Sequence, residues 1–364
     1  TFTTGENPSL ETMKFTLSDF SAKPETGQFD INLSVENFVS PDIDLKLTTR
    51  FDLDYLAKFL NVESLQNLKG LVELSMNFHD IIDLQHPEKS IEKLNESYFT
   101  ELHVKDLGFT IPGYNQRIDR VDIDIKMNGH KAELEKFFIQ VGNTDFSMSG
   151  EIDDLPAVLH HTALPVVTEL HLASKLIDLN QLTGAKGEKV VDEQIKNLKL
   201  DLKFKSSARA LTESPYLPVG EFFIENLFAD FTHYPHSLHD FHADVIIDTS
   251  DISVVDFSGM IDNTDFHFSG GVNKYPLFFQ EKLDGDTELK FDLTSKLFHL
   301  EDILSFGGEN SIPEDYRQEE IKDLKLHGKT EIHFRDAQFH SIDLYLTEFT
   351  GKMKVHPMKL ERFA

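Results

Sequence analysis

The sequence predicts a mainly β protein: an elongated antiparallel sheet, twisted or curved, built from repeated units with short helices at the repeat junctions. Three features carry this prediction. Apolar and polar residues alternate through several stretches, one eight-residue segment returns 120 positions later, and turn-forming residues punctuate the alternating stretches. Alternation with a period of two is typical of strands with one dry and one wet face, as in antiparallel sheets.

The repeat is clearest in the segment Asn143–Gly150, which returns as Asn263–Gly270 with six of its eight residues identical. A second segment, Ile195–Leu200, resembles Ile321–Leu326 and, more loosely, Leu65–Gly70. Repeats cut at both ends are typical of an array, so we expect the chain to be a piece of a longer protein. The expected divisions are a partial N-terminal repeat unit over residues 1–66, repeat units over 67–194 and 195–320, and a partial C-terminal repeat unit over 321–364.

Each alternating stretch predicts one strand, and we expect about five or six strands in each repeat unit. The apolar members of these strands are Val121, Ile123, Ile125 and Met127; Leu198, Leu200, Leu202 and Phe204; Phe241, Ala243, Val245 and Ile247; Leu289, Phe291 and Leu293; and Ile342, Leu344 and Leu346. Turns are predicted where Gly and Asn interrupt the pattern. These positions are Asn128-Gly129, Gly142-Asn143, Gly150, Asp262-Asn263 and Gly270-Gly271.

Helical patterns are short and fall at the repeat junctions. Residues 54–66 place Tyr55, Leu56 and Phe59 at helical spacing, and residues 176–197 and 297–323 have helix-like starts and ends interrupted by glycines. We expect these segments to pack as caps or connectors against sheet edges, where they limit edge-to-edge aggregation.

The amino-acid composition excludes several classes of function. The net charge of −28 repels nucleic-acid phosphates and anionic membrane surfaces. The absence of cysteine excludes disulfides, zinc–thiolate sites and thiol catalysis. The chain has 31 Phe and no Trp, and Phe carries no polar group, so these rings belong on a dry surface.

The histidines suggest a metal site only at first sight. His233, His236, His239 and His242 recur at every third position, but the repeat aligns them with a turn followed by a strand. On a regular strand His239 and His242 would point to opposite faces. We therefore expect solvated histidines, no bound metal and no cofactor.

The acidic residues are expected to be structural. Asp122 and Asp124 share the wet face of a predicted strand, where we expect them to be solvated. Asp145 and Asp265 recur between repeats, which favours a role in turn geometry over catalysis. The sequence has no Gly-x-Ser-x-Gly segment and no Gly-rich phosphate loop, so we expect the protein not to be an enzyme.

The dry face has two interpretations that alternation alone does not separate. In a β-sandwich, the apolar face of one sheet covers that of another. In a continuous curved sheet, the apolar face lines a groove that holds acyl chains, and the repeat and the Phe content favour this second interpretation. The residues expected to line the apolar, lipid-binding face are Val121, Ile123, Ile125, Met127, Leu198, Leu200, Leu202, Phe204, Phe241, Val245, Ile247, Phe266, Phe268, Leu289, Phe291 and Leu293.

The order of segments within a repeat adds a resemblance to a known family. The segment Asp42–Leu47 leads into Phe51–Leu56, the stretch Leu68–Gly70 follows, Leu176–Leu182 repeats the junction, and Phe146–Gly150 forms a strand end of the form Phe-x-x-x-Gly. This order resembles the AsmA/TamB-like proteins of Gram-negative bacteria over most of the chain.

The resemblance implies a non-enzymatic, periplasmic protein of the bridge-like lipid transfer class. Such a protein would shield the acyl chains of phospholipid or lipid A in its β-groove and contribute to outer-membrane biogenesis. It would be anchored to the inner membrane by a segment outside this chain. The alternative is a structural or adhesive β-sandwich repeat protein with no lipid cargo.

Overall fold

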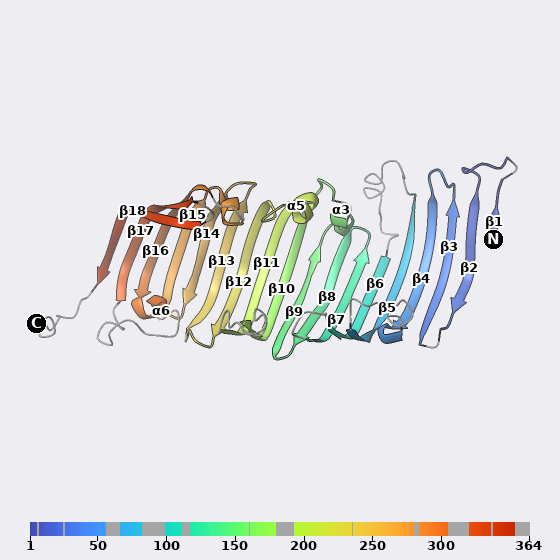
Figure 1. Cartoon of the computed structure of the whole chain (residues 1–364), viewed down its shortest axis with the longest axis horizontal. Coiled ribbons are helices and arrows are strands. Elements are labelled where there is room, and N and C mark those ends of the chain that lie inside the picture. The colour runs from blue at the N-terminus through green and yellow to red at the C-terminus, as the bar shows by residue number, and fades with distance from the viewer. Residues whose placement is uncertain are drawn as a thin grey trace, which may run out of the picture. The chain divides into compact units, whose positions relative to one another are not determined.

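The computed structural model describes residues 1–5, 7–24, 26–55, 66–81, 99–110, 117–159, 161–179, 193–234, 236–279, 284–304, 320–335 and 338–353. The fold is mainly β and antiparallel, as predicted, with a few short helices (Figure 1). The chain divides into two compact units. The N-terminal unit comprises Thr1–Asp192 and Lys205–Glu213, and the C-terminal unit comprises Glu193–Phe204 and Ser214–Ala364.

The N-terminal unit contains ten described strands, each hydrogen-bonded in antiparallel fashion to the next along the chain. They are β1 (Phe2–Thr3), β2 (Lys14–Ala22), β3 (Gly27–Glu36), β4 (Asp42–Asp52), β5 (Gln66–Ile81), β6 (Phe99–Thr110), β7 (Arg117–Asn128), β8 (Lys131–Val141), β9 (Thr144–Ile152) and β10 (Pro165–Asp178). Two short helices, α3 (Leu155–Leu159) and α5 (Ala208–Glu213), pack together around Ala157, Val166 and Ala208.

The C-terminal unit begins in β11 (Gln194–Ser207), which lies beside β12, and strands β12 to β18 pair in sequence order. These strands are β12 (Gly220–Phe231), β13 (Ser237–Ile247), β14 (Ile252–Ile261), β15 (Thr264–Val272), β16 (Gly285–His299), β17 (Glu320–Arg335) and β18 (Gln338–Met353). The 3₁₀ helix η1 (Tyr275–Phe279) precedes β16, and helix α6 (Leu300–Leu304) follows it.

The repeat seen in the sequence is a repeat of strands. Strands β6 to β9 have the same order and similar lengths as β12 to β15, and each set ends in the Asn-Thr-Asp-Phe hairpin. A short helical segment follows in both, α3 in one and η1 in the other, and then a long strand, β10 or β16. The exact limits predicted for the repeat units remain a prediction.

The predicted helices lie mostly outside the described residues. Helix α6 falls within the predicted segment 297–323, but residues 56–65, 180–192 and 305–319 are not described. Residues 176–178, 194–197, 297–299 and 320–323, also predicted helical, belong to strands β10, β11, β16 and β17. Helices α3, α5 and η1 were not predicted, because helices of five or six residues are too short to show a helical period. No helix among the described residues is long and apolar enough to cross a membrane.

Some of the predicted turns are confirmed and others are wrong. Asn128-Gly129, Gly142-Asn143 and Asp262-Asn263 connect adjacent strands, and Gly129, Gly142 and Asp262 have positive φ. Gly150 and Gly270-Gly271 lie inside strands β9 and β15 instead. A Cβ on Gly150 would stand 2.1 Å from the carbonyl oxygen of Glu169, so this glycine permits a close approach of two strands.

Asp and Asn residues mark irregular points in the strands. Five of them combine a φ between 48° and 55° with a shift in strand register: Asp19, Asn67, Asp106, Asp240 and Asp323. Asn197 has the same backbone conformation. These short polar residues tolerate the left-handed region better than other residues. The recurring segment Asn-Leu-Lys or Asp-Leu-Lys therefore marks a β-bulge at residues 67–69 and 323–325.

Candidate functional site

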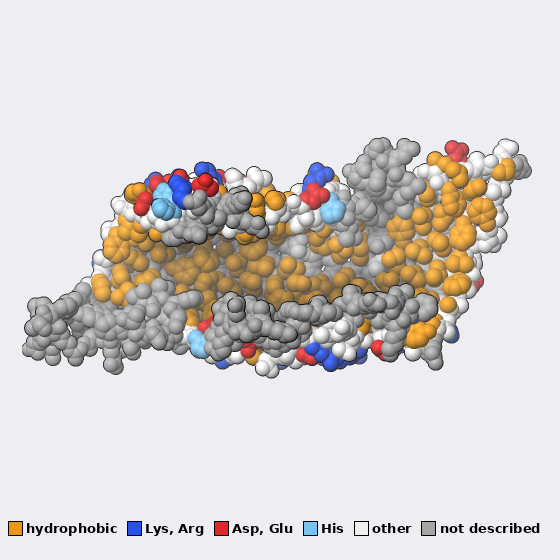
Figure 2. Space-filling view, viewed as in Figure 1, with side chains coloured by type: hydrophobic (Ala, Val, Ile, Leu, Met, Phe, Trp, Pro, Cys, Tyr) orange, Lys and Arg blue, Asp and Glu red, His pale blue; other side chains and the backbone are white. Residues whose placement is uncertain are grey.

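One face of the sheet in the C-terminal unit is apolar from strand to strand. Val245 on β13 is opposite Phe222 on β12 and Val254 on β14, and Phe268 on β15 is opposite Leu293 on β16. Residues directly opposite in an antiparallel pair share a face, so the apolar side chains form continuous rows across the strands. Figure 2 shows hydrophobic side chains gathered over these strands.

The N-terminal unit has the same arrangement. Ile123 on β7 is opposite Val104 on β6 and Phe137 on β8, and Phe137 is in turn opposite Met148 on β9. The rows continue through β2 to β5, where Leu33, Leu45 and Phe78 lie opposite one another in order. Each unit therefore has its own apolar face, visible in Figure 2.

The predicted apolar residues of β7, β13, β15 and β16 lie on these faces. Val121, Ile123, Ile125 and Met127 share one side of β7 in the N-terminal unit, and the remaining twelve lie on β11, β13, β15 and β16 of the C-terminal unit. The ladder partners on β7, β13, β15 and β16 are apolar side chains, apart from a few glycines and threonines, and Phe204 on β11 packs its ring 6.1 Å from that of Phe222. Val121, Met127 and Phe241 are buried and the other thirteen are half-buried.

Several further residues of the apolar face were not predicted from the sequence. Phe222, Ile224 and Phe257 belong to it through their register with β13 and β15. Phe257 packs in a tilted arrangement against Phe241 and edge-on against Phe266, with ring centroids 5.7 and 5.3 Å apart. An extra residue in β14 breaks the alternation between Val254 and Phe257, which hid this strand from a period-two search.

No second sheet covers the apolar face within either unit, as far as the described residues show. Among the described residues, neighbouring strands contact each other most. Helix α3 also contacts α5, and η1 contacts β16. On β18, the apolar-face residues Leu344, Leu346 and Phe349 are 60%, 48% and 67% exposed. The described structure of each unit is thus a single layer, and a two-sheet sandwich is not seen inside either one.

The opposite face of the sheet is charged, and ion pairs connect neighbouring strands across it. In the C-terminal unit, Lys329 Nζ lies 2.9 Å from a carboxylate oxygen of Glu288, and Asp286 lies 2.7 Å from His333 Nδ1. The hydrogen bond that His333 donates to the Asp286 carboxylate raises the pKa of His333. Exposed pairs of this kind add little stability, but they keep this face solvated.

The prediction that Asp122 is solvated on the charged face is wrong. It shares the charged face of β7 with Asp124, as predicted, but it is only 3% exposed and not solvated. Arg120 and Lys136 donate to its Oδ2 at 2.6 and 2.8 Å, and the backbone N–H of Asp106 donates to Oδ1 at 3.0 Å. Asp122 therefore joins three strands of the N-terminal unit.

The recurring Thr-Asp pair holds the end of a neighbouring strand. Thr144 Oγ1 accepts the N–H of Asp178 at 3.0 Å, and Asp145 accepts the N–H of Leu176 at 3.0 Å. Thr264 and Asp265 accept from His299 and Leu297 at 2.9 and 2.8 Å in the same way. These bonds account for the recurrence of Asp145 and Asp265 in structural terms.

The histidine segment differs from its prediction in two ways. His239 is opposite Met260 and His242 is opposite Ser258, so the two histidines share a face. The prediction that they face apart is wrong because a bulge at Asp240 inserts one residue between them. His236, moreover, has a side chain that is only 11% exposed, whereas that of His233 is 50% exposed.

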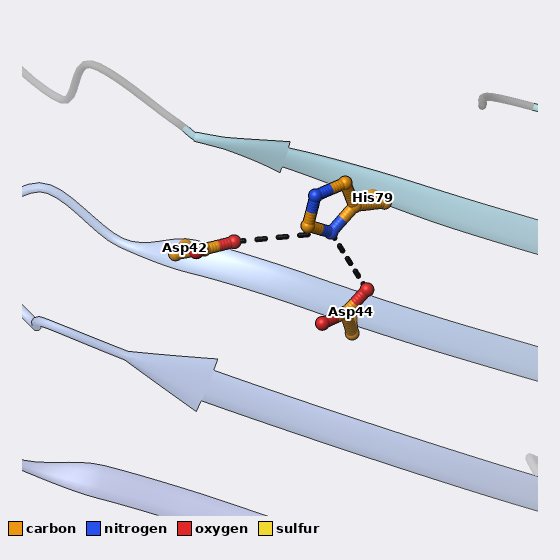
Figure 3. A group of neighbouring side chains, drawn as sticks. All are labelled: Asp42, Asp44 and His79. Carbon is orange, nitrogen blue, oxygen red and sulfur yellow. Dashed lines mark ion pairs between the residues drawn. The ribbon is translucent and has the colours of Figure 1, made fainter. Parts of the chain in front are cut away.

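A group of three possible metal ligands lies on the charged face of the N-terminal unit. His79 Nδ1 on β5 is 2.6 Å from Asp44 and 3.9 Å from Asp42, both on β4 (Figure 3). Their side chains are between 43% and 66% exposed. The arrangement is that of a solvated cross-strand ion pair, and it has no enclosing wall.

Comparison with known proteins adds no relative. Family models, curated proteins and solved structures were searched, and none matches this chain. The candidate site therefore rests on the geometry of the two apolar faces.

Proposed function

We propose that the chain is a non-enzymatic lipid-handling protein of AsmA-like type, whose apolar faces shield lipid acyl chains between membranes. In this proposal it acts in the periplasm, is anchored to the inner membrane through a segment outside this chain, and contributes to outer-membrane biogenesis. The observation that carries the proposal is an apolar face that runs across the paired strands of each unit, with no second sheet upon it among the described residues.

The chemistry of the face supports acyl chains as the occupant. The backbone N–H and C=O groups of interior strands are engaged in the ladders on both sides, so the face presents almost only side chains. Aliphatic and Phe side chains offer non-directional contact and few hydrogen-bonding groups. Lipid tails need no hydrogen bonds, whereas an extended peptide needs partners for its backbone.

The charge distribution supports tails on the sheet and headgroups in water. The net charge of −28 disfavours adsorption of the protein on an anionic membrane surface. Ion pairs such as Lys131–Glu151 and Lys329–Glu288 lie on the opposite face of the sheet. An amphiphile would thus place its tails against the apolar face and leave its headgroup at an open edge.

Native mass spectrometry of the purified chain, followed by organic extraction, tests the proposal. We expect phospholipid or lipid A bound in a defined stoichiometry. A stable protein that carries no lipid and takes up none from vesicles would contradict the proposal and favour the structural or adhesive alternative.

Two adjacent isoleucines on β13 provide matched variants. Ile247 is opposite Gly220 and Ile252 on the apolar face, whereas Ile246 is opposite Glu221 and Ser253 on the charged face and is 44% exposed. We expect Ile247→Arg to lower lipid occupancy roughly tenfold or more, because a charge against acyl chains costs several kcal/mol. Ile246→Arg should retain the lipid, and circular dichroism checks that both variants fold. Equal lipid loss in both would reject the assignment of this face.

A further inference from the structure

Three polar side chains from distant parts of the sequence converge in the C-terminal unit. His236 precedes β13, Asp262 lies in the β14–β15 turn, and Asp302 lies in α6. His236 Nδ1 is 2.6 Å from Asp262 Oδ2 and 3.6 Å from Asp302 Oδ1. One ligand atom from each residue falls within 4.8 Å of the others.

Each carboxylate is held by its other oxygen. Thr264 Oγ1 donates to Asp302 Oδ2 at 2.6 Å, and the N–H of Ser237 donates to Asp262 Oδ1 at 2.9 Å. The oxygens left facing His236 are therefore oriented by outer partners. Such outer hydrogen bonds are typical of metal sites, where they fix the direction of the ligands.

Two members of the group are largely enclosed, the third, Asp262, is 35% exposed, and the group carries two carboxylates against one imidazole. The side chains of His236 and Asp302 are each 11% exposed, and Tyr234, which is 2% exposed, packs its ring 4.9 Å from the His236 ring. The Tyr234 hydroxyl donates to the backbone oxygen of Asp302. Even a protonated His236 balances only one of the two carboxylates, and an uncompensated buried charge is costly.

We propose that His236, Asp262 and Asp302 bind one divalent transition-metal ion, for which Zn²⁺ is the natural probe. Imidazole nitrogen and carboxylate oxygen are both ordinary ligands of this ion. The ion would neutralise both carboxylates with His236 neutral, and would tie α6 to the hairpins of β12–β13 and β14–β15. This site is independent of the lipid-handling proposal, since its residues lie outside the apolar rows.

Isothermal titration of the metal-stripped full chain with Zn²⁺ tests the site. We expect one tight site per chain, weakened roughly tenfold or more in His236→Gln and in Asp262→Asn. Zn²⁺ should also raise the melting temperature of the parent chain, since it binds only the folded state.

The matched control is His267→Gln. His267 Nε2 is 2.9 Å from a single carboxylate, that of Asp256, and both side chains are about half exposed. This variant should bind Zn²⁺ as the parent does. Asp262 is less enclosed than His236, so Asp262→Asn keeps the test valid if His236→Gln does not fold. The proposal is overturned if the parent has no stoichiometric site, or if both variants bind Zn²⁺ as tightly as the parent.

Discussion

Asp122 is a carboxylate that is almost fully buried on the charged face of the N-terminal unit. Burial alone would raise its pKa, but hydrogen bonds from Arg120, Lys136 and the backbone N–H of Asp106 outweigh burial and hold the pKa well below its usual range. A lowered folded-state pKa stabilises the fold above the unfolded-state pKa of about 3.9. That stability is lost as the pH falls through the folded-state value.

We expect Asp122→Asn to lower the free energy of unfolding at pH 7 by about 2 kcal/mol or more, because it leaves Arg120 and Lys136 without their shared partner. The difference from the parent should persist down to about pH 5 and shrink below about pH 4. Urea unfolding followed by circular dichroism at pH 7 and pH 3 measures it.

Asp124→Asn is the control for this prediction. Asp124 lies on the same face of β7, pairs with His103 at 2.9 Å, and its side chain is 34% exposed. Its loss should cost less than about 1 kcal/mol. Equal destabilisation by the two variants would mean that burial of Asp122 contributes nothing.

Two features of individual residues could not be predicted from the sequence: the burial of Asp122 and the grouping of His236, Asp262 and Asp302. That Asp122 and Asp124 share a face follows from alternation, but the burial of Asp122 depends on Lys136, which comes from the next strand. The group of His236, Asp262 and Asp302 has no spacing motif, because its members are 26 and 40 residues apart and meet only through the fold.

Among the strands, β15 comes unusually close to β16. A Cβ on Gly270 would lie 2.1 Å from the backbone oxygen of Lys290, just as one on Gly150 would lie 2.1 Å from that of Glu169. Gly150 and Gly270 therefore occupy equivalent positions in the two copies of the repeat and allow the same close approach of two strands. The clash is with backbone, so a side chain could not simply rotate away.

We expect Gly270→Ala to destabilise the C-terminal unit by about 1 to 3 kcal/mol, the usual cost of overpacking. A loss of stability would be informative, because replacing Gly by Ala in a strand interior otherwise stabilises the fold. Thermal unfolding of the variant measures the change, with Ser269→Ala on the same strand as control. An unchanged or higher melting temperature for Gly270→Ala would contradict the close contact.

The elements that alternation predicted are present, and those it missed have local causes. Strands β7, β11, β13, β16 and β18 contain the predicted alternating stretches. A glycine that ends a turn and one that admits a neighbouring strand look alike in a single sequence, which explains the errors at Gly150 and Gly270. Bulges shift the period by one residue, which explains the errors at His239 and Phe257.

At the scale of the whole chain, the two compact units share one design. Each is an antiparallel sheet with an apolar face on one side and ion pairs on the other, and in each the described strands form a single layer. Alternation predicted the two-faced strands but not whether a second sheet would cover them. That difference depends on contacts between distant residues, which a local pattern does not encode.

Photo-crosslinking with a phosphatidylcholine that carries a diazirine in its acyl chain tests the central claim most directly. Peptide mapping of the labelled chain should place the label on alternate residues of the apolar rows, such as Ile247, Phe268 and Phe291. Label that is equally frequent on their neighbours Ile246, His267 and Asp292, or absent from both faces, would contradict the assignment of the apolar face as the acyl-chain site.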